Sequence, residues 1–169
     1  DMSEQETALI SRTVGLGALK YFILKVDPRK TMLFDPRESI DFNGNTGPFI
    51  QYTYARIRSV LRKAAERGIA PAERLHDGIV LSPEEILLVK TLADYPATVA
   101  QAAENYSPAV IANYLYELSK QYNGYYHDIP ILRESDPAVQ AVRLRLSQTV
   151  AEVIASGAGL LGISVPERM

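Results

Sequence analysis

The sequence contains no cysteine and no tryptophan, and only two of its 169 residues are histidines, His76 and His127. Without cysteine it cannot form a disulfide, a thiolate zinc site or a cysteine nucleophile. Two histidines are too few for a histidine-rich metal site. We therefore predict no metal site and, from these residue types, no catalytic residue.

An excess of charge and long apolar runs are missing as well. Lys and Arg number 18 and Asp and Glu number 20, so the net charge is −2. That balance excludes a uniformly basic nucleic-acid-binding protein and leaves only a local basic patch. No stretch approaches the ~20 apolar residues that span a membrane, and the acidic start, residues 1–6, does not resemble a signal peptide. We expect no membrane segment.

Helix signals dominate the rest of the sequence. A capping residue precedes proline, the residue favoured at the first helical position, at four places. They are Asp35-Pro36, Ser82-Pro83, Ser107-Pro108 and Asp136-Pro137. The first two extend to predicted capping boxes that end at Glu38 and Glu85. With the apolar periodicity, these signals predict helices at about 4–25, from 36 onward, and at 49–67, 83–94, 96–105, 108–122 and 137–158.

The predicted fold is therefore an all-α bundle of about six to seven helices that forms one domain, residues 1–169. Gly15 and Gly17 in the first helix indicate close helix packing or a bend, because glycine is unfavourable inside helices. Residues 123–135 are predicted to be an irregular loop. In the last helix, Arg143 and Arg145 are predicted to lie on the solvated face.

The helix at 49–67 has two different faces when its residues are placed at 100° intervals. One face is apolar and is predicted to form core: Ile50, Thr53, Tyr54, Ile57, Val60, Leu61 and Ala64. The opposite face carries Tyr52, Arg56, Ser59, Lys63 and Arg67, flanked by Arg58 and Arg62. A cationic stripe with one aromatic ring suits RNA, because cations neutralise phosphates and rings stack on bases. An ordinary solvated outer face would look the same.

Tyrosine is abundant, with ten residues against four phenylalanines. Tyr54 and Tyr114 fall on apolar stripes and are predicted to pack in the core. Tyr122, Tyr125 and Tyr126 fall at or after the end of a predicted helix. They indicate either a base-stacking platform or a loop pinned to the core by its own rings.

Three blocks of the sequence resemble a known family. The first, residues 14–22, reads VGLGALKYF and is similar to the family's G-x-x-A-x-R-Y-F helix. The second, residues 47–60, reads GPFIQYTYARIRSV and contains the characteristic Q-Y-x-x-A-R core. The third comprises RLRL at 143–146, LLGI at 160–163 and the final PERM. In this order the blocks resemble the C-terminal, DALR-type anticodon-binding domain of bacterial arginyl-tRNA synthetases.

The resemblance implies a piece of a longer, cytoplasmic class I synthetase that uses ATP to attach arginine to tRNA. The implied partners are the anticodon stem-loop of arginine tRNA and the enzyme's own catalytic domain, with no DNA. Together with the stripe, it gives nine candidate tRNA-binding residues: Tyr52, Arg56, Arg58, Lys63, Tyr122, Asn123, Tyr125, Tyr126 and Met169. Lys20, where the family often has arginine, is predicted to serve the junction with the catalytic domain.

The ATP-binding signatures of such enzymes are missing from the sequence, and residues 76–79, His-Asp-Gly-Ile, are not a version of the first signature. We therefore expect this fragment to bind no ATP or other cofactor and to catalyse no reaction by itself. The alternative is a helical protein-interaction or regulatory module. A continuous basic cleft bordered by Tyr52, Arg56, the loop at 122–127 and Met169 would favour RNA, whereas scattered charge with a large exposed apolar patch would favour a protein partner.

Overall fold

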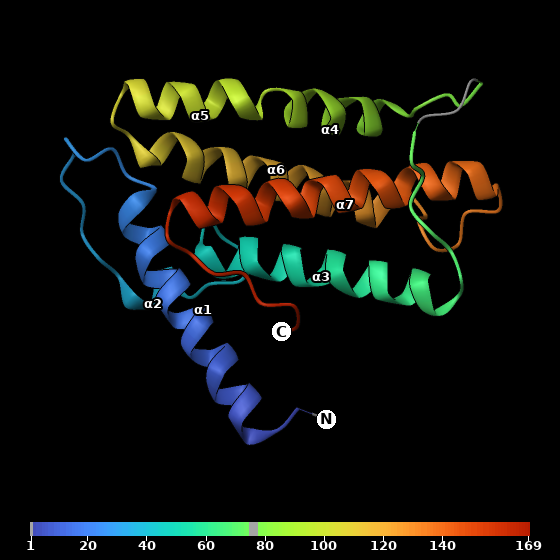
Figure 1. Cartoon of the computed structure of the whole chain (residues 1–169). Coiled ribbons are helices and arrows are strands. Elements are labelled where there is room, and N and C mark those ends of the chain that lie inside the picture. Colours follow the sequence, from blue (N-terminus) through green and yellow to red (C-terminus); the bar gives the residue numbers. More distant parts are fainter. Residues whose placement is uncertain (1, 75–77) are drawn as a thin grey trace.

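The computed structural model of the chain describes residues 2–74 and 78–169, so His76 lies outside the described residues. Within those residues there are seven helices and no β-strand (Figure 1). They are α1 (Glu4–Leu24), α2 (Pro36–Ser39), α3 (Gly47–Glu66), α4 (Pro83–Ala93), α5 (Tyr95–Glu104), α6 (Pro108–Asp128) and α7 (Pro137–Leu160). The prediction of an all-α bundle is confirmed.

The proline-based start signals locate the helices correctly, although they do not always supply the predicted cap. Ser82 and Glu85 form the expected capping box, with Glu85 N donating to Ser82 Oγ at 3.2 Å and Ser82 N donating to Glu85 Oε2 at 2.8 Å. The box predicted at Asp35 is wrong, because the Glu38 carboxylate lies 3.4 Å from Lys25 Nζ instead. Ser107 precedes α6 without a side-chain capping hydrogen bond.

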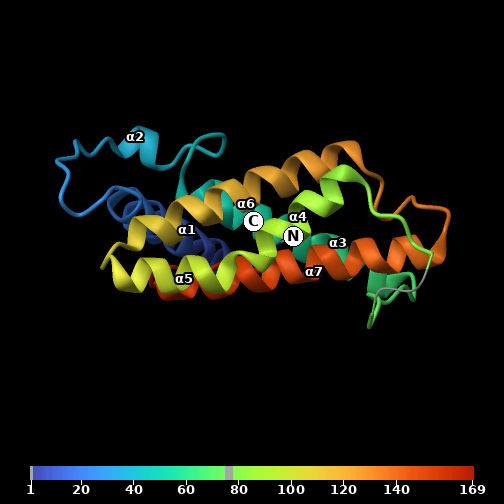
Figure 2. The ribbon, with the colours of Figure 1, turned by 90° about the horizontal axis from the view of Figure 1, so that it is seen from above.

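The helices form three layers, with α6 and α7 in the middle (Figure 1). Helix α3 packs on one side of this pair, and α4 and α5 pack on the other. The view from above shows that α4 is set at an angle to α5 (Figure 2). The core between the layers contains the fully buried Ile57, Leu118, Leu144 and Ile154. Helix α1 crosses α3 obliquely, and its N-terminal end projects away from the bundle.

The crossing of α1 and α3 requires glycine on both helices. A Cβ atom on Gly47 would lie 2.6 Å from the carbonyl oxygen of Gly17, and one on Gly17 would lie 2.8 Å from Cδ of the buried Gln51. A Cβ atom on Gly15 would meet nothing within 4 Å. The predicted close packing is therefore confirmed for Gly17 alone. Beside the crossing, the buried Gln51 Nε2 donates to the carbonyl oxygens of Thr13, at 3.2 Å, and Ser164, at 2.8 Å. Gln51 thus joins α1, α3 and the segment after α7.

Helix α1 is long and apolar enough, by length and composition, to cross a membrane. Arg12 and Lys20 interrupt its apolar sequence, and Lys20 Nζ donates to the carbonyl oxygen of Gly162 at 2.5 Å. One such helix is weak evidence of a membrane span. Although its apolar stretch is only 22% buried, α1 packs along α3 and contributes Tyr21 to the core of the bundle.

The glycine crossing predicts opposite effects for two alanine substitutions. Gly47→Ala should lower the free energy of unfolding by about 1–3 kcal/mol, because its methyl group would meet rigid backbone. Gly15→Ala should raise it by about 1 kcal/mol, because alanine is the better helix former and the space is open. Urea unfolding followed by circular dichroism measures both. Equal effects of the two substitutions would contradict the tight crossing.

Candidate nucleic-acid interface

A groove with a volume of about 1120 Å³ runs between α3, the end of α6, the loop after α6 and the last two residues of the chain. Six of the nine candidate residues line it: Tyr52, Arg56, Lys63, Asn123, Tyr126 and Met169. Four further cations line it too: Arg62, Arg67, Arg133 and Arg168. Asp128 is the acidic side chain among the lining residues. The groove is therefore a concentrated basic surface on a chain of net charge −2.

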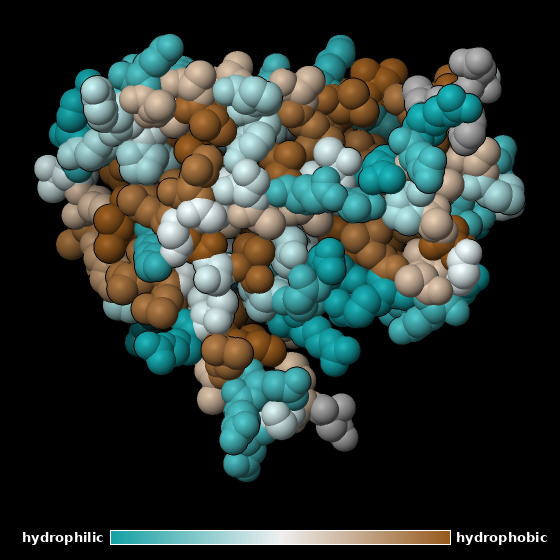
Figure 3. Space-filling view, viewed as in Figure 1, coloured by the Kyte–Doolittle hydropathy of each residue, from teal (hydrophilic) through white to brown (hydrophobic). Residues whose placement is uncertain are grey.

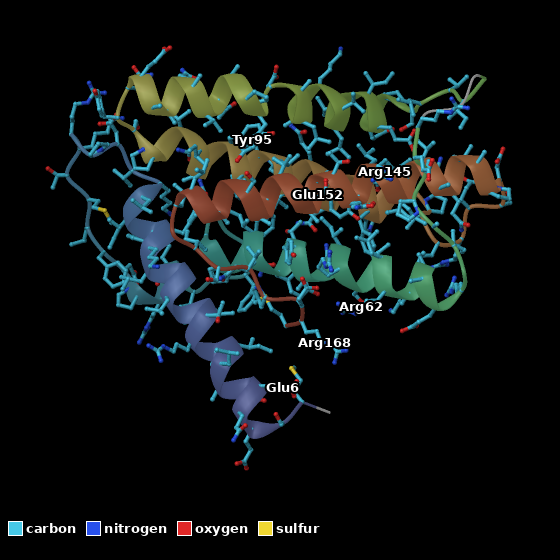
Figure 4. The ribbon with its side chains drawn as sticks, viewed as in Figure 1. Glu6, Arg62, Tyr95, Arg145, Glu152 and Arg168 are labelled. Carbon is cyan, nitrogen blue, oxygen red and sulfur yellow. The ribbon has the colours of Figure 1, made fainter. Side chains whose placement is uncertain are left out.

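Two views show where this surface lies on the molecule. Hydrophilic side chains gather along the edge formed by α3 and the C-terminal segment (Figure 3). Arg62 and Arg168 lie on this same side of the bundle, although they come from α3 and from the end of the chain (Figure 4). The continuous basic cleft that would favour RNA is thus present.

Arg56 lies between two tyrosine rings in this groove. Its Cζ atom is 4.8 Å from the ring centroid of Tyr52 and 5.1 Å from that of Tyr126. Its Nη1 donates to Asn123 Oδ1, and Asn123 Nδ2 donates in turn to Thr53 Oγ1 at 2.8 Å. Both ends of the Asn123 amide therefore have a partner, and the guanidinium of Arg56 is held in one orientation beside the exposed rings.

Phe42 extends this row of aromatic rings and was missed by the sequence analysis. Its ring meets that of Tyr52 edge to face, with 6.3 Å between the centroids, and it is exposed in the loop between α2 and α3. Edge-to-face contact is a favoured geometry for aromatic pairs. No helical periodicity marks a residue in such a loop, so only its type, an apolar ring among Asp41, Asn43 and Gly44, could have singled it out.

The predicted loop over residues 123–135 is wrong in its first part, because α6 continues to Asp128. Tyr122 and Tyr125 therefore keep the helical spacing and point into the core, where they are 0% and 1% exposed. The Tyr122 hydroxyl donates to Ser147 Oγ at 3.1 Å, and burial raises the pKa of this phenol. Neither ring is available to stack on a base. Tyr126, 41% exposed, is the ring that faces the groove.

The prediction that Arg143 and Arg145 lie on a solvated face is also wrong. Arg143 Nε donates to Glu85 Oε1 at 2.8 Å, and its Nη1 lies 2.5 Å from Glu134 Oε2 and 2.7 Å from the carbonyl oxygen of Pro130. Arg145 Nε donates to the carbonyl oxygen of Ala72 at 2.5 Å. Helix α7 lies in the middle layer, so its polar side chains meet other segments. Arg143 thereby ties α4 and α7 to the loop that forms one wall of the groove.

Arg58 does not line the groove and has a partner within the chain. Its Nε donates to Glu167 Oε2 at 2.7 Å, and this hydrogen bond raises the pKa of the guanidinium. Tyr54, core as predicted, donates its hydroxyl hydrogen to Glu167 Oε1 at 3.1 Å. Burial, and then the carboxylate, raise the pKa of the Tyr54 phenol. The segment after α7 is therefore attached to α3 by both polar and apolar contacts.

Comparison with known proteins identifies the family to which this helical domain belongs. Residues 50–169 match the family model described as the DALR anticodon binding domain. The chain belongs to this family. The arginine–tRNA ligase of Bacteroides thetaiotaomicron is 61% identical over 168 residues, which cover 99% of this chain and 28% of that protein. That of Porphyromonas gingivalis is 53% identical over 169 residues, covering 100% and 28%.

Solved structures agree with the fold. The Thermus thermophilus arginyl-tRNA synthetase matches with a TM-score of 0.87 and 35% identity, over 100% of this chain and 28% of that one. The Plasmodium falciparum arginyl-tRNA synthetase, 24% identical with a TM-score of 0.79 over 95% and 28%, supports the fold alone. The chain spans just over a quarter of the length of these relatives.

The opposite environments of two neighbouring tyrosines give a direct prediction. Tyr125→Ala should lower the free energy of unfolding by about 3–5 kcal/mol, because it leaves a cavity in the core. Tyr126→Ala should cost about 1 kcal/mol or less, because its ring is largely at the surface. Urea unfolding of the two variants measures the difference. Similar losses would contradict the extension of α6 to Asp128.

Proposed function

We propose that this chain is the anticodon-binding domain of an arginyl-tRNA synthetase and that its groove binds the anticodon stem-loop of arginine tRNA. The observation that carries the proposal is the basic groove with exposed aromatic rings, in a domain of the DALR anticodon-binding family. The parent enzyme would attach arginine to tRNA with ATP in the cytoplasm. This domain would contribute tRNA recognition, with no cofactor and no catalytic residue of its own.

The geometry suits an unpaired RNA loop for two reasons. Tyr52 and Tyr126 are each 41% exposed and present ring area to the groove, as stacking on splayed bases requires. Lys63, exposed on the outer face of α3, and Arg67, exposed at its C-terminal cap, are placed to neutralise phosphates along the RNA backbone. Arg56 is the planar cation between the rings and can stack or donate hydrogen bonds to a base edge.

A second partner would be the catalytic domain of the same enzyme, through the outer face of α1. The exposed residues of that face include Leu9, Leu16, Leu19 and Ile23. Leu9, Leu16 and Ile23 are spaced seven residues apart and so lie along one stripe of the helix. Lys20, the predicted junction residue, donates a hydrogen bond from its Nζ to the carbonyl oxygen of Gly162. It would therefore act by fixing α1 against the segment after α7.

The stacking rings supply the most specific prediction. Tyr52→Ala and Tyr126→Ala should each weaken binding of the anticodon stem-loop of arginine tRNA by about five- to a hundredfold, because base–aromatic stacking contributes about 1–3 kcal/mol. Tyr106→Ala is the matched control, because Tyr106 is highly exposed at the junction of α5 and α6. Fluorescence anisotropy measures the affinities. Equal affinity for an unrelated tRNA loop, or an unchanged affinity of Tyr52→Ala, would contradict the proposal.

The cations should contribute differently from the rings. Lys63→Ala should weaken binding of the arginine and unrelated stem-loops alike and should reduce the slope of log K against log salt by about one. Lys90→Ala on the exposed face of α4, in the opposite layer, is the charge-matched control and should leave the slope unchanged. Titrations at several salt concentrations measure the slope. An unaltered slope for Lys63→Ala would show that Lys63 does not neutralise an RNA phosphate.

A further inference from the structure

The segment after α7 returns across α3 and ends at the groove (Figure 1). Its first half is anchored firmly, because Leu161 and Ile163 are buried and the carbonyl oxygen of Ser164 accepts from Gln51 Nε2. Its last residue, Met169, lines the groove and is half-buried. The ends of most domains fray unless something holds them. The contacts made by residues 165–168 therefore determine whether Met169 stays at the groove.

Glu167 makes those contacts. Its two carboxylate oxygens are shared between two residues one helical turn apart on α3: Tyr54 at 3.1 Å and Arg58 at 2.7 Å. One turn further along, Arg62 Nη1 donates to the backbone carbonyl oxygen of Glu167 at 3.1 Å and lies 3.9 Å from its carboxylate. The side chain and the backbone of one residue are thus fixed by successive turns of the same helix.

The contacts suit a positioning role better than a stabilising one. The carboxylate is half exposed, and exposed ion pairs contribute little to the free energy of unfolding. Glu167 is nevertheless only two residues from Met169, so its attachment limits where the methionine side chain can lie. A charge-assisted hydrogen bond with fixed geometry restricts motion even where it adds little stability.

We propose that Glu167 is a positioning residue, whose carboxylate is clasped by Tyr54, Arg58 and Arg62 so that Arg168 and Met169 form a fixed wall of the groove. The proposal rests on the proposed function in so far as the groove binds RNA. It assigns Arg58 a different role from the phosphate contact expected from the sequence: Arg58 would act on RNA through Glu167 and the end of the chain.

A Glu167 that competes with RNA would have the opposite effect on affinity from a Glu167 that positions the end of the chain. If the Glu167 carboxylate merely occupied Arg58 and Arg62 where a phosphate would otherwise bind, its removal would free two cations and strengthen RNA binding. If Glu167 is instead a positioning residue, its removal lets Arg168 and Met169 move and so weakens RNA binding. The sign of the change in affinity therefore distinguishes the two roles.

The first measurement is the affinity of Glu167→Gln for the anticodon stem-loop of arginine tRNA. We expect it to fall about fivefold, the scale of one partly exposed ion pair. Glu104→Gln, which removes the same charge from an exposed site at the end of α5, should leave it unchanged. In a Met169→Ala background, Glu167→Gln should have a smaller effect than in the unaltered chain, because only the Arg168 part of the wall is left for it to loosen. Tighter binding, or additive losses, would overturn the proposal.

The second measurement needs no RNA. The chain has three methionines, at positions 2, 32 and 169, so ¹³C-methyl labelling gives few signals, and Met169→Leu identifies the one in question. In Glu167→Gln the Met169 signal should narrow and move toward its random-coil position, while that of Met32, which does not line the groove, stays. An unchanged Met169 signal would refute the positioning role of Glu167. Failure of the unaltered chain to bind the stem-loop would refute the proposed function. The Met169 signal would then still test whether Glu167 positions the end of the chain.

Discussion

The burial of one face of α3 is the constraint on which the rest of the structure depends. Helices α1, α6 and α7 all pack on it, and its residues from Ile50 to Ala64 are small or apolar apart from polar side chains such as Gln51 and Thr53, which form hydrogen bonds there. The same period turns Tyr52, Arg56 and Lys63 to the other side. Core and groove are thus two faces of one helix, and their registers cannot shift independently.

This coupling explains how much of the molecule could be predicted from the sequence. The two faces of α3 follow from spacing alone, and so do the helix starts, because capping and proline act over a few residues. The end of α6 is predicted wrongly because Asn-Gly, here Asn123-Gly124, is a local signal for a turn. The spacing of Leu115, Leu118, Tyr122 and Tyr125 continues the core stripe through it, and core packing outweighs the cost of one glycine in the helix.

The features that could not be predicted are pairs that are distant in sequence. Arg143 with Glu85, Arg58 with Glu167 and the contact of Gly17 with Gly47 each join different segments. Charged residues in helices are mostly exposed, so local pattern assigns Arg143 to solvent and Arg58 to a ligand. Only the middle position of α7, and the return of the chain across α3, give these side chains partners within the protein.

The link between core and groove is most direct at Asn123. Its amide is bound on one side by Thr53, which is fully buried and itself donates to the carbonyl oxygen of Phe49, and on the other side by Arg56. A free arginine would lose rotamer freedom on meeting RNA, and that loss would weaken binding. Here the loss has already occurred on folding, so the core of the bundle orients the cation that its surface presents. A basic groove on a chain of net charge −2 depends on such preorganisation more than a uniformly basic protein would, because the chain lacks a broad electrostatic field.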